Sequence, residues 1–372
     1  MLLIDWDRNI GADYRPVYEA ALNGLGLSYD VFNGGTAAAG NAGPTFAQLQ
    51  NYRAVVMFTG NNTTSWANAH VGGSFPLQGY LVRGGRIVLT GQDLNSQVAY
   101  NQNTGSDFLY ANMAGWLTGA ERNPPTAATQ PCGTIRSDRD FYGTGAANPA
   151  TAQLETAFTL FGRTGDASTN LGGTGAGNQR FPDAGRTVRG SDALDQCVEV
   201  YNAFQVEPLA RVLGGYTTTK KNGTAVSRLT DAVATGVAPD ATLEDLHPNV
   251  TWGAAYMHVG LEGLNANRGQ LSAQSALGLL YDFVADDLSI AVVQRVRPAN
   301  RVDFTANATS SRGVAITKYR WDFGDGSPIV ETTSPSVSYQ YGARATYEVH
   351  VQAVTALTRS GVGTATVRLG RE

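Results

Sequence analysis

The 372-residue chain has few charged side chains and no excess of either sign. Asp, Glu, Lys and Arg make up 16% of the residues, and the formal net charge at pH 7 is −4. Proteins that bind nucleic acid or anionic membranes carry clusters of Lys and Arg, which this composition lacks. No run reaches the ~18 consecutive apolar residues that a membrane-spanning helix needs. We therefore expect neither a nucleic-acid partner nor a transmembrane segment.

Cysteine is also scarce, since the chain has only Cys132 and Cys197. Neither cysteine lies in a CxxC motif or another spacing typical of metal ligands. In a secreted protein we expect the two to form a disulfide, which would contribute ~3–4 kcal/mol in the chain-entropy model. The alternative is two unrelated buried thiols.

Most of the chain alternates short apolar strands with helices. Each apolar run is short and ends in polar residues, as buried parallel strands do. This alternation predicts an α/β domain with an open parallel sheet and right-handed crossovers over about residues 1–288. The pattern is lost in Gly, Thr, Asn and Pro between about 120 and 215, which predicts a long insert. The strands are expected at 2–4, 29–32, 54–58, 86–89 and 254–259, and the helices at 16–26, 75–82 and 271–288.

The last part of the chain shows strand periodicity only. Aromatic residues alternate with polar ones at Tyr319, Trp321 and Phe323, and an Asp325-Gly326 turn follows. Similar alternation around Tyr339 predicts a small β-sandwich over 289–372, with Trp321, Phe323 and Tyr339 in its core. The motifs WDFGDGS, SYQY and TYEVHVQAV resemble a PKD domain, an immunoglobulin-like module common in secreted bacterial proteins.

The first domain carries a second resemblance, in the order of its motifs. These are LLIDWDRN, YRAVVMFTGNN, YLVRGGRIVLTGQDL, GGTGAGNQRFPDA and ATLEDLHPNVTWGAAYMHVGLEGLN. Their order resembles the glutamine-amidotransferase-like domain found after the catalytic domain of secreted bacterial subtilisin-type proteases. The resemblance implies a flavodoxin-like parallel sheet, an accessory role, and a longer precursor whose protease domain lies upstream.

The motifs that would support catalysis are missing. An amidotransferase needs a Cys on the elbow that follows a strand. The elbow after strand 86–89 reads TGQDL, and Gln92 has no nucleophilic atom. The chain has no Gly-Thr-Ser and no His-Gly, which a subtilisin-type triad would bring. We therefore expect residues 1–372 not to be an enzyme.

Polar residues near the start of the chain resemble the beginning of a calcium loop. Asp5, Asp7, Asn9 and Asp13 stand at positions 1, 3, 5 and 9 of such a loop. The glycine comes at position 7 rather than 6, and no Glu closes position 12. These departures favour the alternative, in which the side chains cap the following helix; apart from calcium, no cofactor is expected.

Further polar residues follow the neighbouring strands of the same sheet. Because the carboxyl ends of parallel strands share one edge, these side chains are expected to line a crevice with Asp5. An enzyme that uses this crevice is a third, less favoured alternative. The residues are Thr59, Asn61, Gln92 and Asp93.

Taken together, the motifs predict a non-catalytic accessory region that is extracellular or at the cell surface. Its expected partner is an extracellular polymer or protein substrate. The alternative is a structural or adhesive protein that assembles with copies of itself into a fibre or coat, because Gly/Thr/Asn-rich loops of low charge suit such contacts.

Overall fold

A computed structural model describes residues 1–7, 13–35, 43–59, 76–90, 153–170, 211–221, 224–227, 232–246, 250–257, 260–264 and 271–370. The chain divides into two compact units. The first contains Met1–Val237 and Trp252–Val284, and the second contains Ala238–Thr251 and Ala285–Glu372. None of the helices in these ranges is long and apolar enough to cross a membrane.

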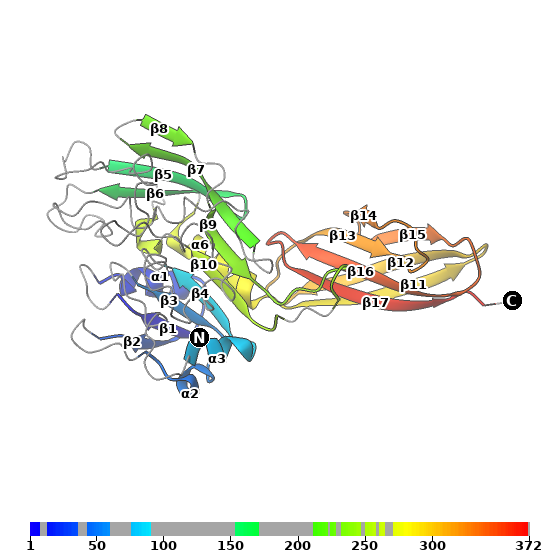
Figure 1. Ribbon diagram of the computed structural model, residues 1–372, viewed down its shortest axis with the longest axis horizontal. Coiled ribbons are helices and arrows are strands. Elements are labelled where there is room, and N and C mark those ends of the chain that lie inside the picture. Colours follow the sequence, from blue (N-terminus) through cyan, green and yellow to red (C-terminus); the bar gives the residue numbers. More distant parts are fainter. Residues whose placement is uncertain are drawn as a thin grey trace, which may run out of the picture. The chain divides into compact units, whose positions relative to one another are not determined.

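The first unit is built on a mixed sheet whose first half is parallel. Five strands lie side by side in the order β2-β1-β3-β4-β10 (Figure 1). Most of their residues are buried, as expected for a parallel sheet covered on both faces. The strands are β1 (Leu2–Asp5), β2 (Asp30–Asn33), β3 (Val55–Phe58), β4 (Arg86–Thr90) and β10 (Gly253–Met257).

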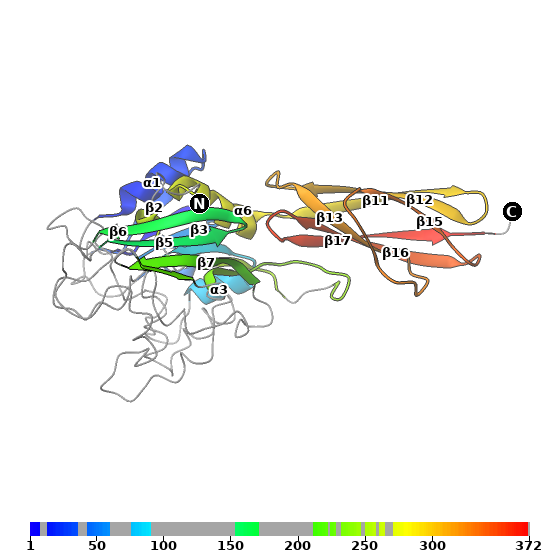
Figure 2. The ribbon, with the colours of Figure 1, turned by 90° about the horizontal axis from the view of Figure 1, so that it is seen from above.

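Helices cover both faces of the parallel strands. Helices α1 (Arg15–Gly24) and α6 (Ala273–Ala285) lie on one face and α3 (Pro76–Val82) on the other (Figure 2). Gln274 of α6 donates a hydrogen bond to the carbonyl oxygen of Gly24, 2.8 Å away, which joins α6 to the end of α1. The short helix α2 (Phe46–Leu49) begins with a capping box between Thr45 and Gln48.

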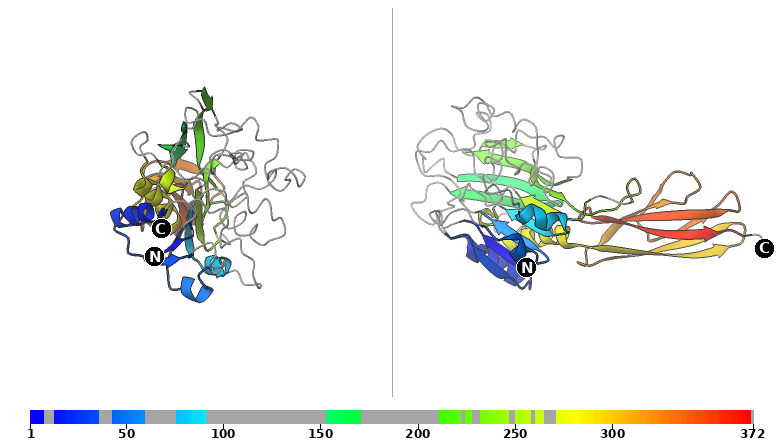
Figure 3. Two further views of the ribbon diagram at one scale, coloured as in Figure 1. Left: turned by 90° about the vertical axis from the view of Figure 1, so that its left-hand side faces the viewer. Right: turned by 60° about the horizontal axis from the view of Figure 1, so that its bottom comes forward.

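Antiparallel strands extend the sheet beyond β10, where green strands continue past the blue and cyan ones (Figure 3). They follow in the order β9 (Ala232–Val237), β7 (Arg211–Lys221), β5 (Gln153–Leu160) and β6 (Arg163–Asn170), with β8 (Thr224–Ser227) paired to β7. Strands β5 and β6 lie inside the stretch 120–215, which the sequence predicted as a long insert, and neither strand was among the expected elements. Phe158 covers its cross-strand partner Gly165, where even a Cβ atom would overlap the ring. Because glycine takes the buried position opposite Phe158, β6 lacks the apolar alternation by which a strand is recognised in a sequence.

The second unit is a β-sandwich of two antiparallel sheets. One contains β11 (Leu288–Arg297), β12 (Arg301–Ser310) and β15 (Ser336–Gln340). The other contains β14 (Val330–Thr332), β13 (Ile316–Asp322), β16 (Thr346–Thr355) and β17 (Ser360–Arg368). Residues 238–251 also belong to this unit, and its C-terminal part begins at Ala285.

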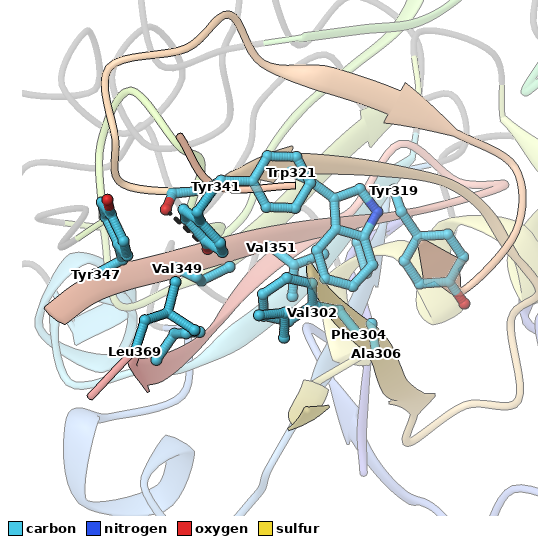
Figure 4. Packing of buried hydrophobic residues seen from close by; sticks show 13 residues of the cluster. Val302, Phe304, Ala306, Tyr319, Trp321, Tyr341, Tyr347, Val349, Val351 and Leu369 are labelled. Atoms are coloured by element: carbon cyan, nitrogen blue, oxygen red, sulfur yellow. Dashed lines mark hydrogen bonds between the residues drawn. The ribbon is translucent and has the colours of Figure 1, made fainter. Parts of the chain in front are cut away.

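Aromatic side chains fill the space between the two sheets (Figure 4). Trp321 and Phe323 are fully buried, and the Trp321 and Phe304 rings lie 6.0 Å apart between their centroids. Tyr339 is partly buried and stacks on Phe323 at a centroid distance of 3.8 Å. The three residues predicted for the core therefore all contact it, with Tyr339 at its margin.

The turn that follows β13 is stabilised by its own acidic side chains. The Asp322 Oδ1 atom accepts from the Gly324 N–H at 2.9 Å, and Asp325 Oδ1 accepts from the Ser327 N–H at 3.0 Å. The Tyr339 hydroxyl donates to Asp325 Oδ2 at 2.8 Å. These acidic residues thus act as turn acceptors.

Candidate functional site

Buried polar side chains gather at the carboxyl ends of β1, β3 and β4. Asp5 and Asp7 are 4% and 1% exposed, while Thr59 and Thr90 are 0% exposed. The three strands are parallel and adjacent, so their carboxyl ends share one edge of the sheet. Four buried polar groups at one edge make this the strongest candidate site in the first unit.

The backbone at the start of α1 faces two of the predicted acidic residues. The Tyr14 N–H donates to Asp7 Oδ2 at 2.9 Å, and the Arg15 N–H donates to Asp13 Oδ1 at 3.0 Å. Both carboxylates therefore satisfy N–H groups at the first turn of the helix, which would otherwise lack partners. Asn9, the remaining member of the predicted calcium set, lies outside the described residues.

Asp5 lies in a different environment from Asp7. Its Oδ2 atom is 3.8 Å from Arg15 Nη1, beyond a direct hydrogen bond, and its buried Oδ1 atom has no hydrogen-bond partner in the described part of the chain. Burial, together with the neighbouring charge of Asp7, raises the pKa of Asp5 from 3.8 to about 7. About half of the Asp5 carboxyl groups are therefore protonated at neutral pH.

In the described ranges, no three or more His, Cys, Asp or Glu side chains are grouped so that they could hold a metal ion. Asp13 is exposed and bonded to the helix backbone, and Asp7 is bonded to the Tyr14 N–H. The contacts of Asp7 and Asp13 agree with the capping alternative.

A second polar network joins α1 to the carboxyl end of β4. The Tyr18 hydroxyl lies 2.7 Å from Thr90 Oγ1, donates to Glu262 Oε2 at 2.9 Å and accepts from the Leu261 N–H at 3.1 Å. Because Tyr18 has one proton and gives it to Glu262, the Thr90 hydroxyl is the donor of the shared bond. Glu262 belongs to the short 3-10 helix η9 (Leu261–Gly263).

The Tyr18 side chain is fixed and kept neutral by this environment. Its ring stacks on Phe58 of β3 with centroids 4.0 Å apart, and no part of it is exposed. Burial, followed by the charge of Glu262, raises the pKa of Tyr18 well above its ordinary value. Sequence reasoning missed this network because Tyr18 belongs to the apolar face of α1, and Glu262 is distant in sequence.

Only part of the predicted crevice falls in the described residues. Thr59 follows β3, and its buried Oγ1 atom has no hydrogen-bond partner within the described ranges. Asn61, Gln92 and Asp93 lie outside those ranges, as do Cys132 and Cys197. The described site is therefore a carboxyl pair beside an arginine and a tyrosine locked by hydrogen bonds.

The family comparison concerns the C-terminal part of the chain. A family model described as PKD domain matches residues 286–369. Residues 286–369 are therefore a PKD domain with an immunoglobulin-like fold. A search of curated proteins found no match to this chain.

Several solved PKD domains are similar to this part of the chain. The PKD1 domain of Vibrio anguillarum Epp shares 15% identity, covers 23% of this chain and 95% of its own, and has a TM-score of 0.20. The PKD1 domain of the Vibrio cholerae metalloprotease PrtV shares 19% identity over 22% of this chain and 99% of its own, with a TM-score of 0.20. The PKD domain of an M14-like peptidase from a Thermoplasmatales archaeon shares 23% identity over 23% of this chain and 100% of its own, again with a TM-score of 0.20.

Proposed function

We propose that this chain is a non-catalytic accessory region of a secreted protein, and that it binds an extracellular polymer or protein substrate at or outside the cell surface. The observation that carries this proposal is the PKD domain at residues 286–369. Modules of this kind are appended to proteins whose main activity lies in another domain. We further propose that the parent is a secreted subtilisin-type protease, on the motif order of the first domain.

The first unit is proposed to be an amidotransferase-like scaffold of the flavodoxin-like type. Its parallel strands follow the order β2-β1-β3-β4-β10, which is the 2-1-3-4-5 order of that fold class when β10 is counted as the fifth strand. The position that would hold the nucleophile follows β4, and the sequence there contains Gln92. A side-chain amide cannot attack an acyl group, so this scaffold is proposed to be inactive.

The described polar groups at the sheet edge support a structural role more than catalysis. Asp7 caps the backbone of α1, and Tyr18 is held by three hydrogen bonds with its pKa raised. A nucleophile needs the opposite shift, towards a lower pKa, or an adjacent base. These contacts favour a fold-stabilising role for the side chains of Asp7 and Tyr18.

The proposal is tested by binding and activity assays on the intact chain. The protein is sedimented with insoluble polysaccharide and with insoluble protein fibres, and glutaminase and casein hydrolysis are measured in parallel. We expect binding to one class of polymer and rates at the blank. Turnover that survives repurification and is lost on mutating a residue at the sheet edge would contradict the proposal, as would sedimentation with neither polymer.

Self-assembly is the alternative function, and one feature of the second unit favours it. Strands β14 and β15 lie at the ends of their sheets, so in the described sandwich each has one side without a strand partner. Such edges can pair with a strand of another copy. Light scattering coupled to size-exclusion chromatography separates the two functions: a monomer supports the accessory role, and fibres or rings support assembly.

A further inference from the structure

The polypeptide passes between the two units three times. It enters the second unit at Ala238, returns to the first at Trp252, and enters the second again at Ala285. Segment 238–251 therefore packs with the PKD domain although both of its ends continue into strands β9 and β10 of the first unit. A PKD domain joined only through its N-terminus would have no such segment.

A buried ion pair joins this segment to the PKD domain. Arg359 Nε donates to Asp240 Oδ1 at 2.6 Å, and the two side chains are only 2% and 3% exposed. Next to this pair, the Ser360 hydroxyl donates to the carbonyl oxygen of Ala241 at 2.9 Å. The pair is shielded from water, so salt screens it far less than a surface ion pair.

The turn between β16 and β17 holds Arg359 in place. The Thr355 N–H donates to the Arg359 carbonyl oxygen at 2.8 Å, and the Arg359 N–H donates to Thr355 Oγ1 at 3.1 Å. Thr358 closes this turn with a positive φ of 61°. The arginine is therefore presented by a tight hairpin and not by a loose loop.

A second contact lies at the edge of the segment. Arg320 donates to both carboxylate oxygens of Glu244, with Nη2–Oε1 at 2.7 Å and Nη1–Oε2 at 3.1 Å. Glu244 stands in a turn closed by the Thr242 N–H, which donates to the Asp245 carbonyl oxygen at 2.9 Å. The segment thus offers two carboxylates, one buried and one exposed, to two arginines of the sandwich.

From these contacts we infer that segment 238–251 is a non-covalent anchor, which keeps the PKD domain attached when the chain is cut between α6 and β11. A cut at this connection leaves Asp240 and Glu244 on the N-terminal fragment and their arginines on the C-terminal fragment. Separation would break the Asp240–Arg359 pair, the two hydrogen bonds from Arg320 to Glu244 and the bond from Ser360 to Ala241 together, and this opposes release. The inference stands on the contacts of the segment and does not depend on the proposed function.

The experiment cuts the full-length protein at one engineered position. A recognition sequence for a specific protease is inserted between Asp287, which is exposed, and Leu288. The uncut protein is first checked for an unchanged melting profile, and the cut protein is then run on size-exclusion chromatography at low micromolar concentration. We expect the fragments to elute together and to separate only in denaturant.

Variants then assign the attachment to the segment. Asp240→Ala should weaken the affinity of the cut fragments by about 100-fold or more, because it removes the buried carboxylate that accepts from Arg359 Nε. The double variant Asp240→Leu with Arg359→Met replaces the pair by apolar side chains and should keep the fragments together. If Asp240→Ala does not fold before cutting, Glu244→Gln serves instead, with a smaller loss of about threefold, since its ion pair is exposed.

A matched control removes an ion pair that lies wholly within the C-terminal fragment. Arg297 Nε and Asp303 Oδ2 are 2.7 Å apart, and Asp303→Asn should leave the attachment unchanged. The Ser310 hydroxyl donates to Asp286 at 2.7 Å, which is a further contact between the two fragments. Asp286→Asn measures how much this contact contributes to the affinity of the fragments, and it should have less effect than Asp240→Ala. The inference is overturned if the cut wild-type fragments separate, or if the fragments carrying Asp240→Ala and those carrying Glu244→Gln bind as tightly as the wild type.

Discussion

Replacing Asp5 by Asn should stabilise the first unit at neutral and alkaline pH. Asp5 is 4% exposed, lies beside Asp7, and has one carboxylate oxygen without a hydrogen-bond partner in the described ranges. The nearest described cation, on Arg15, is 3.8 Å away and also lies 3.6 Å from Glu19. Asparagine keeps the shape of the side chain and removes the charge that burial opposes.

The magnitude and sign of this change in stability follow from the raised pKa of Asp5, which is about 7 in the folded protein against 3.8 for the ordinary group. Between these values the folded state binds more protons than the unfolded state, so stability falls as the pH rises from about 4 to 7. A difference of about 3 pKa units at 1.36 kcal/mol each gives a cost of about 4 kcal/mol above pH 7. This cost belongs to the Asp5–Asp7 pair and is an upper value.

The measurement is urea denaturation of the wild type and Asp5→Asn at pH 4, 6 and 8. We expect nearly equal free energies of unfolding at pH 4 and a variant more stable by up to about 4 kcal/mol at pH 8. Asp30→Asn, at an exposed carboxylate, is the matched control and should show no such trend. A variant that is less stable at pH 8, or a difference that does not change with pH, would refute the reasoning. Stabilisation of the wild type by millimolar calcium would show that a cation balances the charge instead.

Three further changes test the second unit. Arg320 lowers the pKa of Glu244 to about 2. The ion pair should therefore contribute to the stability of the second unit, by about 1 kcal/mol after solvent screening, above pH 4.5, and this contribution is lost as the pH falls through 2. Acid denaturation of Glu244→Gln should lack this pH-dependent contribution. Gly324→Ala should cost more than Gly326→Ala in a thermal melt, because both have φ above 70° but only the first Cβ would meet a backbone carbonyl oxygen; equal costs would count against the packing of the turn. Trp321→Ala should cost about 3–5 kcal/mol and shift only the transition of the second unit in calorimetry. A shift of the first unit's transition would show that the two units unfold together.

The parallel strands were predictable because their burial requires continuous apolar runs in the sequence. The expected strands 2–4, 54–58 and 86–89 correspond to β1, β3 and β4, each an apolar run that ends where polar residues begin. A strand buried on both faces must be apolar throughout, so its length and ends can be read locally. The PKD domain was predictable for a related reason, since its aromatic alternation marks one buried face per strand.

Strands β5 and β6 and the anchor segment could not be found in this way. Strand β6 reads RTGDASTN and owes its place to pairing with β5, a non-local interaction that composition does not reveal. Asp240 and Arg359 are 119 positions apart, and neither stands in a motif. The sequence predicts a single domain boundary near residue 289. In the structure, residues 238–251 pack with the second unit although the chain then returns to the first unit.

The candidate site shows the same limit at the level of single atoms. Asp5 and Asp7 are equivalent in the sequence, as alternate acidic residues after a strand, and both were predicted for one calcium or capping site. Their environments differ in the structure: Asp7 Oδ2 accepts the Tyr14 N–H at 2.9 Å, whereas burial is the largest cause of the raised pKa of Asp5. Burial opposes the charged form of Asp5 and is the main cause of its raised pKa. Whether a carboxylate caps a helix, holds a proton or meets a cation is thus decided by which backbone donors reach it, and these donors are placed by the entry of the chain into α1.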